Sequence, residues 1–188
     1  MLKIEFVGDG LLRFTELVDT LGSKKAERAY AIALNRTGQK VFTRVRRVVA
    51  KQAGVSQRDA VRYGQLQQAK AGGGRLEHRV KASGRSLPTT IFKSRQTRKG
   101  VSASPWGRRL TFPGTFKVAS LGGHVFKRTG AANSGSGRAN AITKHWGPAI
   151  PRELVRDASA EAFYEVSGKE MPVELSRAVY VLTKRKMK

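Results

Sequence analysis

Hydrophobic residues recur along the chain at intervals that distinguish strands from helices. Near the start, Leu2, Ile4 and Phe6 alternate with polar residues, and this period of two predicts a short strand. After a glycine-rich turn, apolar positions over 11–21 predict a short helix that ends at Gly22. A strand and a short helix are therefore expected ahead of the main elements.

A longer helix is predicted from about Lys24 to Ala53, with Ser23 as its N-terminal cap and Gly54 at its end. Apolar positions spaced by three and four give it one buried face. That face comprises Tyr30, Leu34, Thr37, Val41, Val45 and Val48, widened by Ala26, Ala33 and Phe42. Basic residues recur at the same spacing about a quarter turn away. This basic stripe comprises Arg36, Lys40, Arg44, Arg47 and Lys51. It is either a solvated helix side or a surface that faces DNA or an acidic partner.

The middle of the chain predicts a sheet. Ser56 and Asp59 resemble a capping box, which predicts a short helix through Arg62 closed by Gly64. From there to residue 128, short apolar segments alternate with Gly, Pro and Ser, a pattern typical of strands and turns. Strands are expected at 66–71, 76–82, 89–93, 110–112, 116–119 and 124–127, and a basic loop is expected at Arg95, Arg98 and Lys99.

The last third predicts helices. The small, polar segment 131–140 predicts a flexible loop, and Pro151 suits a first helical position. An apolar face over 154–166 predicts a helix that ends at Gly168. Pro172 then predicts the start of a last helix, although a β-rich run at the end also permits a strand. We expect one α+β domain over 1–188, with a long N-terminal helix packed on a twisted, mostly antiparallel sheet and C-terminal helices beside it.

The charge of the chain is strongly unbalanced. Lys and Arg number 37 against 13 Asp and Glu, which gives a formal net charge of +24. Such a surface repels itself unless a polyanion or an acidic partner balances it. Nucleic acid is one candidate partner, because contacts of Lys and Arg with phosphates release counterions. The alternative is that the basic surface is buried in a large assembly.

Enzymatic signatures are missing from the sequence. The chain has no cysteine, no Gly-Lys-Ser/Thr loop and no Gly-x-Ser-x-Gly elbow. His78, His124 and His145 lie far apart without an acidic cluster at ligand spacing. Neither a signal peptide nor a membrane span is expected. We therefore predict a protein without enzymatic activity, metal or cofactor, assembled in a cytoplasm.

Carboxylates spaced by four predict an acidic row along one helix side. The row comprises Glu153, Asp157, Glu161 and Glu165. Like charges at this spacing disfavour an isolated helix, so the row is expected either to be solvated or to dock on a basic surface of the same chain or the next subunit. A metal-dependent nuclease would use such carboxylates to hold Mg²⁺, although a single line of them does not converge on one ion.

Two tryptophans lie beside glycine, with proline close by. Trp106 follows Pro105, and Trp146 precedes Gly147 and Pro148. Such side chains either stack on nucleic-acid bases or anchor a loop on the core, and we expect the second.

A set of motifs follows in a fixed order along residues 24–185. The set comprises Ala31–Gly38, the short helix at Val55–Asp59, Leu87-Pro88, Phe112-Pro113-Gly114-Thr115-Phe116, Gly123–Gly130, and Gly147-Pro148-Ala149-Ile150-Pro151. Pro113-Gly114 predicts a tight hairpin-like turn that Phe112 and Phe116 pin to the core. Pro148 and Pro151 fix the backbone where the sheet passes into the helix.

This ordered set resembles the minor tail protein Z family of tailed bacteriophages, which is related to tail-completion proteins at the head–tail joint. The resemblance implies a structural virion protein at the head-proximal end of the tail, in a homo-oligomeric ring around the DNA channel. It implies contacts with the tail terminator, the head-completion protein and packaged DNA, and Arg36, Lys40, Arg44, Arg47, Arg95, Arg98 and Lys99 are the residues expected to make them. A free basic nucleic-acid-binding protein is the alternative.

Overall fold

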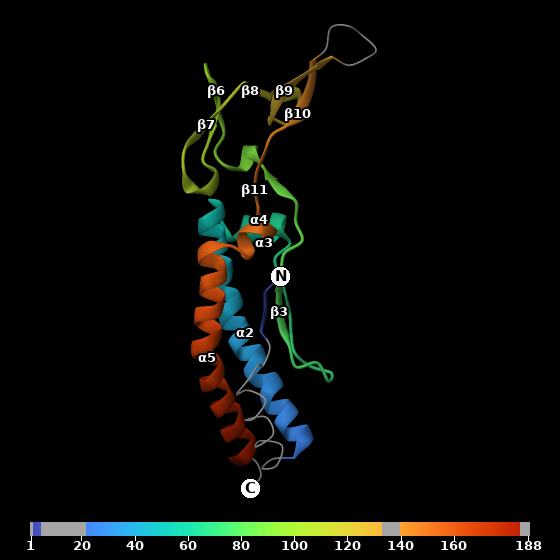
Figure 1. Cartoon of the computed structure of the whole chain (residues 1–188), viewed down its shortest axis with the longest axis vertical. Helices are drawn as coiled ribbons and strands as arrows, with labels where there is room; N and C mark the ends of the chain where they lie inside the picture. Colours follow the sequence, from blue (N-terminus) through green and yellow to red (C-terminus); the bar gives the residue numbers. More distant parts are fainter. Residues whose placement is uncertain (1, 5–21, 133–139, 185–188) are drawn as a thin grey trace.

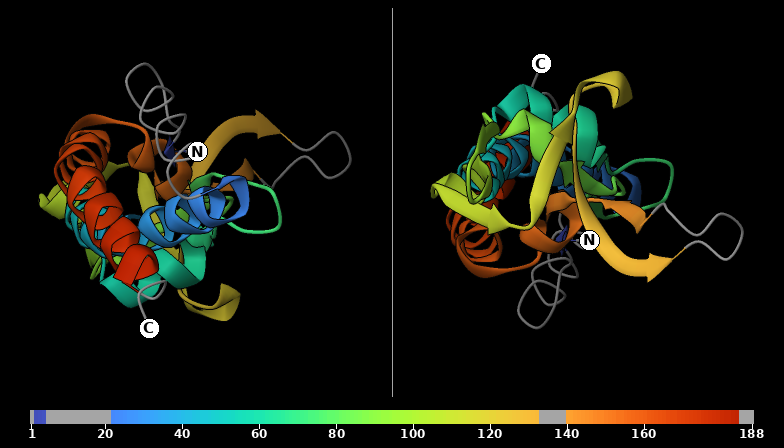
Figure 2. Two further views of the ribbon diagram at one scale, coloured as in Figure 1. Left: turned by 90° about the horizontal axis from the view of Figure 1, so that it is seen from below. Right: turned by 90° about the horizontal axis from the view of Figure 1, so that it is seen from above.

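Two long helices run side by side along one half of the molecule (Figure 1). The computed structural model describes residues 2–4, 22–132 and 140–184. Helix α2 (Ser23–Ala53) and helix α5 (Asp157–Lys184) are antiparallel neighbours in contact, and the view from below in Figure 2 shows them side by side. Most strands lie beyond the C-terminal end of α2 and pair in antiparallel sheets. Long helices and antiparallel sheets together confirm the expected α+β class.

Helix α2 ends where its sequence predicts. Gly54 adopts the left-handed conformation, at φ 75°, and its N–H donates to carbonyls of the last turn. The predicted start is wrong by one residue. Ser23 lies within the helix, and the carbonyl of Gly22 accepts the N–H groups of Lys25 and Ala26. The cap is therefore a backbone carbonyl and not the serine hydroxyl.

Helix α5 is continuous, which corrects the prediction of a break at Gly168 and a new element at Pro172. Both residues lie inside one helix of 28 residues. Ala29 and Ala33 of α2 pack on Ala178 of α5, flanked by apolar side chains of both helices. Small residues let the two backbones approach closely, and this packing outweighs the local helix-breaking tendency of Gly and Pro.

In the described residues, four small antiparallel sheets take the place of the single sheet that was expected. The first contains β1 (Leu2–Ile4), β3 (His78–Lys81) and β2 (Gln67–Ala69) and lies beside α2 (Figure 1). The second contains β5 (Arg95–Thr97), β6 (Gly100–Ala103) and β7 (Leu110–Pro113). The third contains β8 (Thr115–Val118), β9 (His124–Ala132) and β10 (Asn140–Lys144). The fourth pairs β4 (Ser86–Pro88) with β11 (Trp146–Ala149).

The strand expected at the start of the chain is present as β1, five of the six strands expected over 66–127 are present, and the strand expected at 89–93 is wrong. That segment forms a 3₁₀ turn, η1 (Thr89–Ile91), after β4. The sequence pattern also missed β4, β5, β6, β10 and β11, which are short or rich in Gly and Pro. The helix predicted over 11–21 and most of the loop predicted over 131–140 lie outside the described residues.

The Pro113-Gly114 step is not a hairpin, contrary to the prediction. Strand β7 pairs with β6, whereas β8 pairs with β9, so the chain passes from one sheet to the next at Gly114. Thr115 holds this crossing: its hydroxyl donates to the Phe112 carbonyl and accepts the N–H of Val101 at 3.0 Å. The Pro–Gly motif therefore links two sheets.

Helices α3 (Gln57–Gly64) and α4 (Ile150–Leu154) lie where the long helices meet the strands (Figure 1). Ser56 caps α3 as predicted, since its hydroxyl accepts the N–H of Asp59, and that hydroxyl also donates to the Asp59 carboxylate. Pro151 lies in the first turn of α4, as predicted. Gly64 belongs to α3, and a Cβ there would stand 2.5 Å from Ile150.

The main core joins α2 to the strands and to the short helices. Its fully buried side chains include Leu34, Val41, Val45, Leu87, Phe92, Ile150, Leu154 and Phe163. The six main positions of the predicted face are buried except the last, where Val49 takes the place of Val48. Of the three residues that widen the face, Ala26 and Ala33 are buried and Phe42 is half-buried. His78 is also fully buried against α2, and burial, followed by the charge of Lys70, lowers its pKa.

Two helical glycines provide a matched test of this packing. A Cβ on Gly38 would collide with the imidazole of His78, whereas a Cβ on Gly168 meets nothing within 4 Å. We expect Gly38→Ala to destabilise the fold by about 1–3 kcal/mol through overpacking. Gly168→Ala should stabilise it by about 0.5–1 kcal/mol through helix propensity. Urea unfolding measures both, and equal stabilisation by the two changes would contradict the close contact between α2 and β3.

Candidate anion-binding interface

The first half of the basic stripe on α2 is neutralised by α5. The Lys40 ammonium lies 2.7 Å from one oxygen of Glu174 and 2.6 Å from Glu170, and the Arg36 guanidinium lies 3.7 Å from Glu174. Arg177 of α5 adds an interaction of 2.9 Å with the same carboxylate. Arg36 and Lys40, two of the expected DNA contacts, are therefore engaged within the chain.

Glu174 is the centre of this cluster and its side chain is only 4% exposed. The hydrogen bond from Lys40 lowers the pKa of Glu174, and burial opposes the change. The hydrogen bonds to Glu170 and Glu174 raise the pKa of Lys40 in turn. The cluster therefore joins the two helices by charge as well as by apolar contact.

The acidic row does not lie on one helix, which corrects the sequence prediction. Glu153 belongs to α4 and is buried, whereas Asp157, Glu161 and Glu165 are exposed on α5. Asp157 has a φ of 49°, in the left-handed region, so α4 and α5 do not form one continuous right-handed helix. Glu165 pairs with Lys169 at 2.7 Å, and that hydrogen bond lowers the pKa of Glu165.

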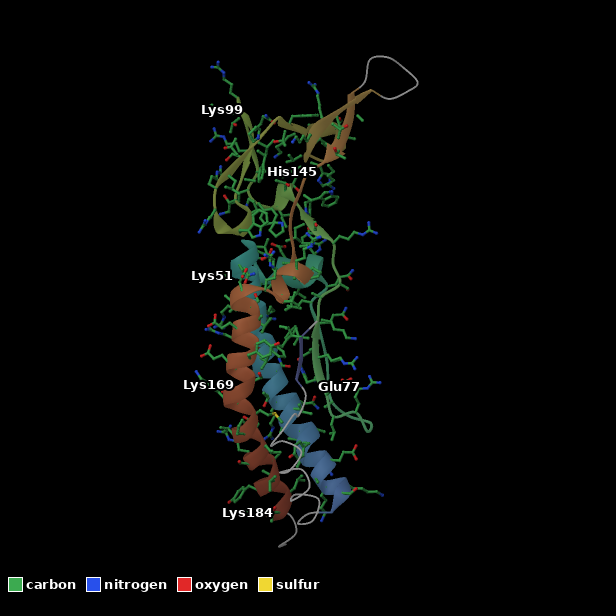
Figure 3. All side chains as sticks on the ribbon, viewed as in Figure 1. Lys51, Glu77, Lys99, His145, Lys169 and Lys184 are labelled. Atoms are coloured by element: carbon green, nitrogen blue, oxygen red, sulfur yellow. The ribbon has the colours of Figure 1, made fainter. Side chains whose placement is uncertain are left out.

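The end of the molecule opposite the long helices is basic. Between Glu77 and Glu153 the sequence contains no Asp or Glu. Arg95 lies on β5, and Arg98 and Lys99 form the turn before β6, so the expected basic loop is a hairpin turn. Figure 3 shows Lys99 projecting from the tip. Within 22–132 and 140–184, no ion pair reaches these three exposed side chains. Arg95, Arg98 and Lys99 are called the basic turn below.

Residues of the ordered motifs lie where the strands meet the helical part. Phe112 is half-buried against the core and its ring lies 4.4 Å from that of His145. The Thr89 hydroxyl bonds His145 at both the ring Nδ1 and the carbonyl, each at 2.9 Å. Burial, followed by the charge of Lys127, lowers the pKa of His145. Gly147 is required beside this site because a Cβ would stand 2.6 Å from the Phe92 ring.

Phe116 takes part in a separate ring cluster in the third sheet. Its ring lies 6.5 Å from that of Phe126, and the Arg128 guanidinium lies 5.4 Å from its centre. Phe112 thus pins the chain to the core as predicted, and Phe116 packs within its own sheet.

A groove of about 770 Å³ lies between α2, the start of α5 and the 3₁₀ turn η2 (Pro105–Gly107). Its cations are Arg44, Arg47, Lys51, Arg108 and Arg156, and its carboxylates are Glu153 and Asp157. The second half of the basic stripe therefore faces an open groove. The sequence did not indicate that Arg108, Arg156 and Trp106 join it, because the segment of Trp106 and Arg108 is distant in the chain from Arg156 and from α2.

Both tryptophan side chains are half-exposed, and Trp106 holds its turn on the core through a hydrogen bond to the buried Glu153. Trp106 is 45% exposed and Trp146 is 46% exposed. The Lys144 ammonium lies 4.6 Å from the centre of the Trp146 ring. Trp106 lines the groove, where its indole N–H donates to Glu153 at 3.1 Å.

Polar contacts between three segments hold Trp106 in place. Gln52 of α2 donates to the second oxygen of Glu153 at 2.8 Å and accepts the hydroxyl of Ser159 at 3.0 Å. Gly54 allows η2 to touch the end of α2, since a Cβ there would collide with the backbone of Gly107. The indole ring of Trp106 is therefore held by Glu153, and its backbone is held by the packing of η2 against Gly54.

No arrangement for metal chemistry is present in the described part of the chain. Over 2–4, 22–132 and 140–184, no three side chains of His, Asp or Glu come together as metal ligands would. Over the same residues, none of the helices combines the length and the apolar character that a bilayer crossing needs.

Comparison with known proteins gives no relative. No protein-family model matches the chain, and neither a curated protein nor a solved structure matches it. Function therefore has to be inferred from the residues and from the geometry of the site.

The Glu174 cluster predicts a specific dependence of stability on pH. Glu174→Gln should lower the free energy of unfolding at neutral pH by about 1–3 kcal/mol, since it removes a charged hydrogen-bond acceptor. Because the folded pKa of Glu174 is lowered, its contribution is present above the ordinary value of 4.5 and disappears as pH falls through the folded pKa. The difference between the two proteins should therefore shrink below about pH 4.5.

Urea unfolding across this pH range measures the difference. Glu161→Gln removes an exposed carboxylate of the same helix and serves as the control, which should stay close to the native protein. A constant difference between native and Glu174→Gln down to strongly acidic pH would contradict the assignment.

Proposed function

We propose that this chain is a structural virion protein of a tailed bacteriophage, which completes the tail at its head-proximal end and helps to join it to the head around the DNA channel. One observation carries the proposal: the sequence has no carboxylate between Glu77 and Glu153, while in the helical end cations such as Lys40 and Lys169 are paired with carboxylates of α5. The ordered motifs that resemble minor tail protein Z support the same assignment.

The separation of charge suits a subunit that presents one end to a polyanion. The basic turn projects from the strands, away from the paired helices (Figure 3). A ring of such subunits would direct many unpaired cations at packaged DNA, or at acidic faces of the tail terminator and the head-completion protein. The exposed carboxylates Asp157 and Glu161 remain available to a neighbouring subunit.

The shape also suits assembly more than catalysis. Long helices, short sheets and a polar groove without a convergent metal set form an elongated body with separate surfaces for different neighbours (Figure 1). The motifs Phe112–Phe116 and Gly147–Pro151 act in the fold as connections between sheets and helices. We therefore assign a structural role in the virion.

Location in the particle tests the proposal directly. Parent phage particles are labelled with an antibody against this chain and viewed by electron microscopy. We expect label at the head–tail joint. Intact particles without label, together with antigen found only free of particles, would refute the virion role and favour a free nucleic-acid-binding protein.

A charge-reversal pair tests which end meets DNA. Replacing Arg95, Arg98 and Lys99 by Glu should weaken binding to duplex DNA and make its dependence on salt shallower, by about one unit of the logarithmic slope for each phosphate that the variant no longer binds. The matched control replaces Lys24, Lys25 and Arg28, which are exposed at the opposite end of α2. Both variants change the net charge equally, so equal weakening of binding would show that only total charge matters.

A further inference from the structure

The groove beside Trp106 combines an apolar floor with a basic rim. Val48, Ala158 and the half-exposed ring of Trp106 supply apolar surface, and five Lys or Arg side chains surround it. Of the two carboxylates, Glu153 is buried and already accepts hydrogen bonds from Trp106 and Gln52. Only Asp157 opposes the cations from an exposed position. The groove is therefore prepared for an anion that also carries an apolar surface.

Trp106 is held in an unusual conformation. Its φ is 53°, in the left-handed region that bulky residues rarely occupy. The close approach of η2 to Gly54 and the hydrogen bond to Glu153 maintain it. Backbone strain of this kind persists where the surroundings enforce it, and it often marks a binding site. Here its result is a large aromatic ring kept at the surface among cations.

The cations of α2 extend the site along one direction. Arg44, Arg47 and Lys51 follow each other at three and four residues on one helix side, which spans about 10 Å of helix. Arg108 comes from the part of the sequence between Glu77 and Glu153, which has no carboxylate. A linear polyanion matches such a row better than a single small ion does.

We propose that this groove binds single-stranded nucleic acid, with a base stacked on Trp106 and the neighbouring phosphates on Arg44, Arg47 and Lys51. Base stacking on aromatic side chains combined with a basic track is the usual means of binding single strands. In duplex DNA the base faces are stacked on one another, so a duplex would contact only the cations of the groove. An acidic protein segment would satisfy the cations without requiring the exposed indole. This inference goes beyond the proposed function and does not depend on it.

Intrinsic fluorescence isolates the proposed contact. The chain has two tryptophans, so Trp146→Phe leaves Trp106 as the only indole reporter. We expect saturable quenching of this protein by an oligothymidylate of about twelve nucleotides, a length within the range that single-strand sites accommodate. A duplex of the same length should bind without comparable quenching. Absence of quenching by the single strand, with binding detected by another method, would overturn the stacking contact.

Affinity measurements with matched variants complete the test. Fluorescence anisotropy of labelled oligothymidylate follows binding to the full chain. Trp106→Leu should weaken binding by about tenfold. Trp146→Leu, at the other half-exposed tryptophan, should leave it unchanged, and Arg44→Gln with Arg47→Gln should weaken it and reduce the salt dependence. Far-UV circular dichroism confirms folding of each variant.

Three outcomes would overturn the proposal: equal affinities of Trp106→Leu and Trp146→Leu, no effect of the two arginine changes, or displacement of the oligonucleotide by polyglutamate at equal charge concentration. The last result would instead assign the groove to an acidic protein segment. Label at the head–tail joint would remain as expected in each case, so failure of this inference is distinguishable from failure of the proposed function.

Discussion

The packing of α2 along α5 is the contact on which the rest of the described structure depends. Ala29 and Ala33 bring the helices close to Ala178, and the buried Glu174 joins them through Lys40 and Arg36. The sheets have only two or three strands each, and such small sheets are not stable alone. Three of them contribute to the core that they share with α2, through Val80 of β3, Leu87 of β4 and Ala103 of β6.

The candidate groove depends on the same pair of helices. α2 presents Arg44, Arg47 and Lys51 on the side where α5 begins, and α4 places Glu153 between them and Trp106. Gly54 ends α2, and its lack of a side chain also lets the backbone of η2 pack against it. One glycine is therefore needed both by the helix end and by the loop. The polar contacts from Ser159 through Gln52 to Glu153 then fix the tryptophan at the surface.

Charge is divided between the two ends of the molecule for a physical reason. Carboxylates of α5 lie beside the cations of α2 and offset part of the positive charge of that helix. The strands after Glu77 have no such partners in the sequence, and the basic turn stays exposed. An external polyanion or acidic surface is then the means by which that repulsion is relieved.

The sequence by itself determined the elements whose signals are local. The periodic face of α2, its end at Gly54, the capping box at Ser56 and Asp59, and the carboxylate-free stretch all follow from neighbouring residues. Only the tertiary structure decided the continuity of α5 through Pro172, the separation of β7 from β8, and the exposure of Trp106. These depend on contacts between residues distant in the chain, whose packing energy overrides local propensity and has no period to be seen in the sequence.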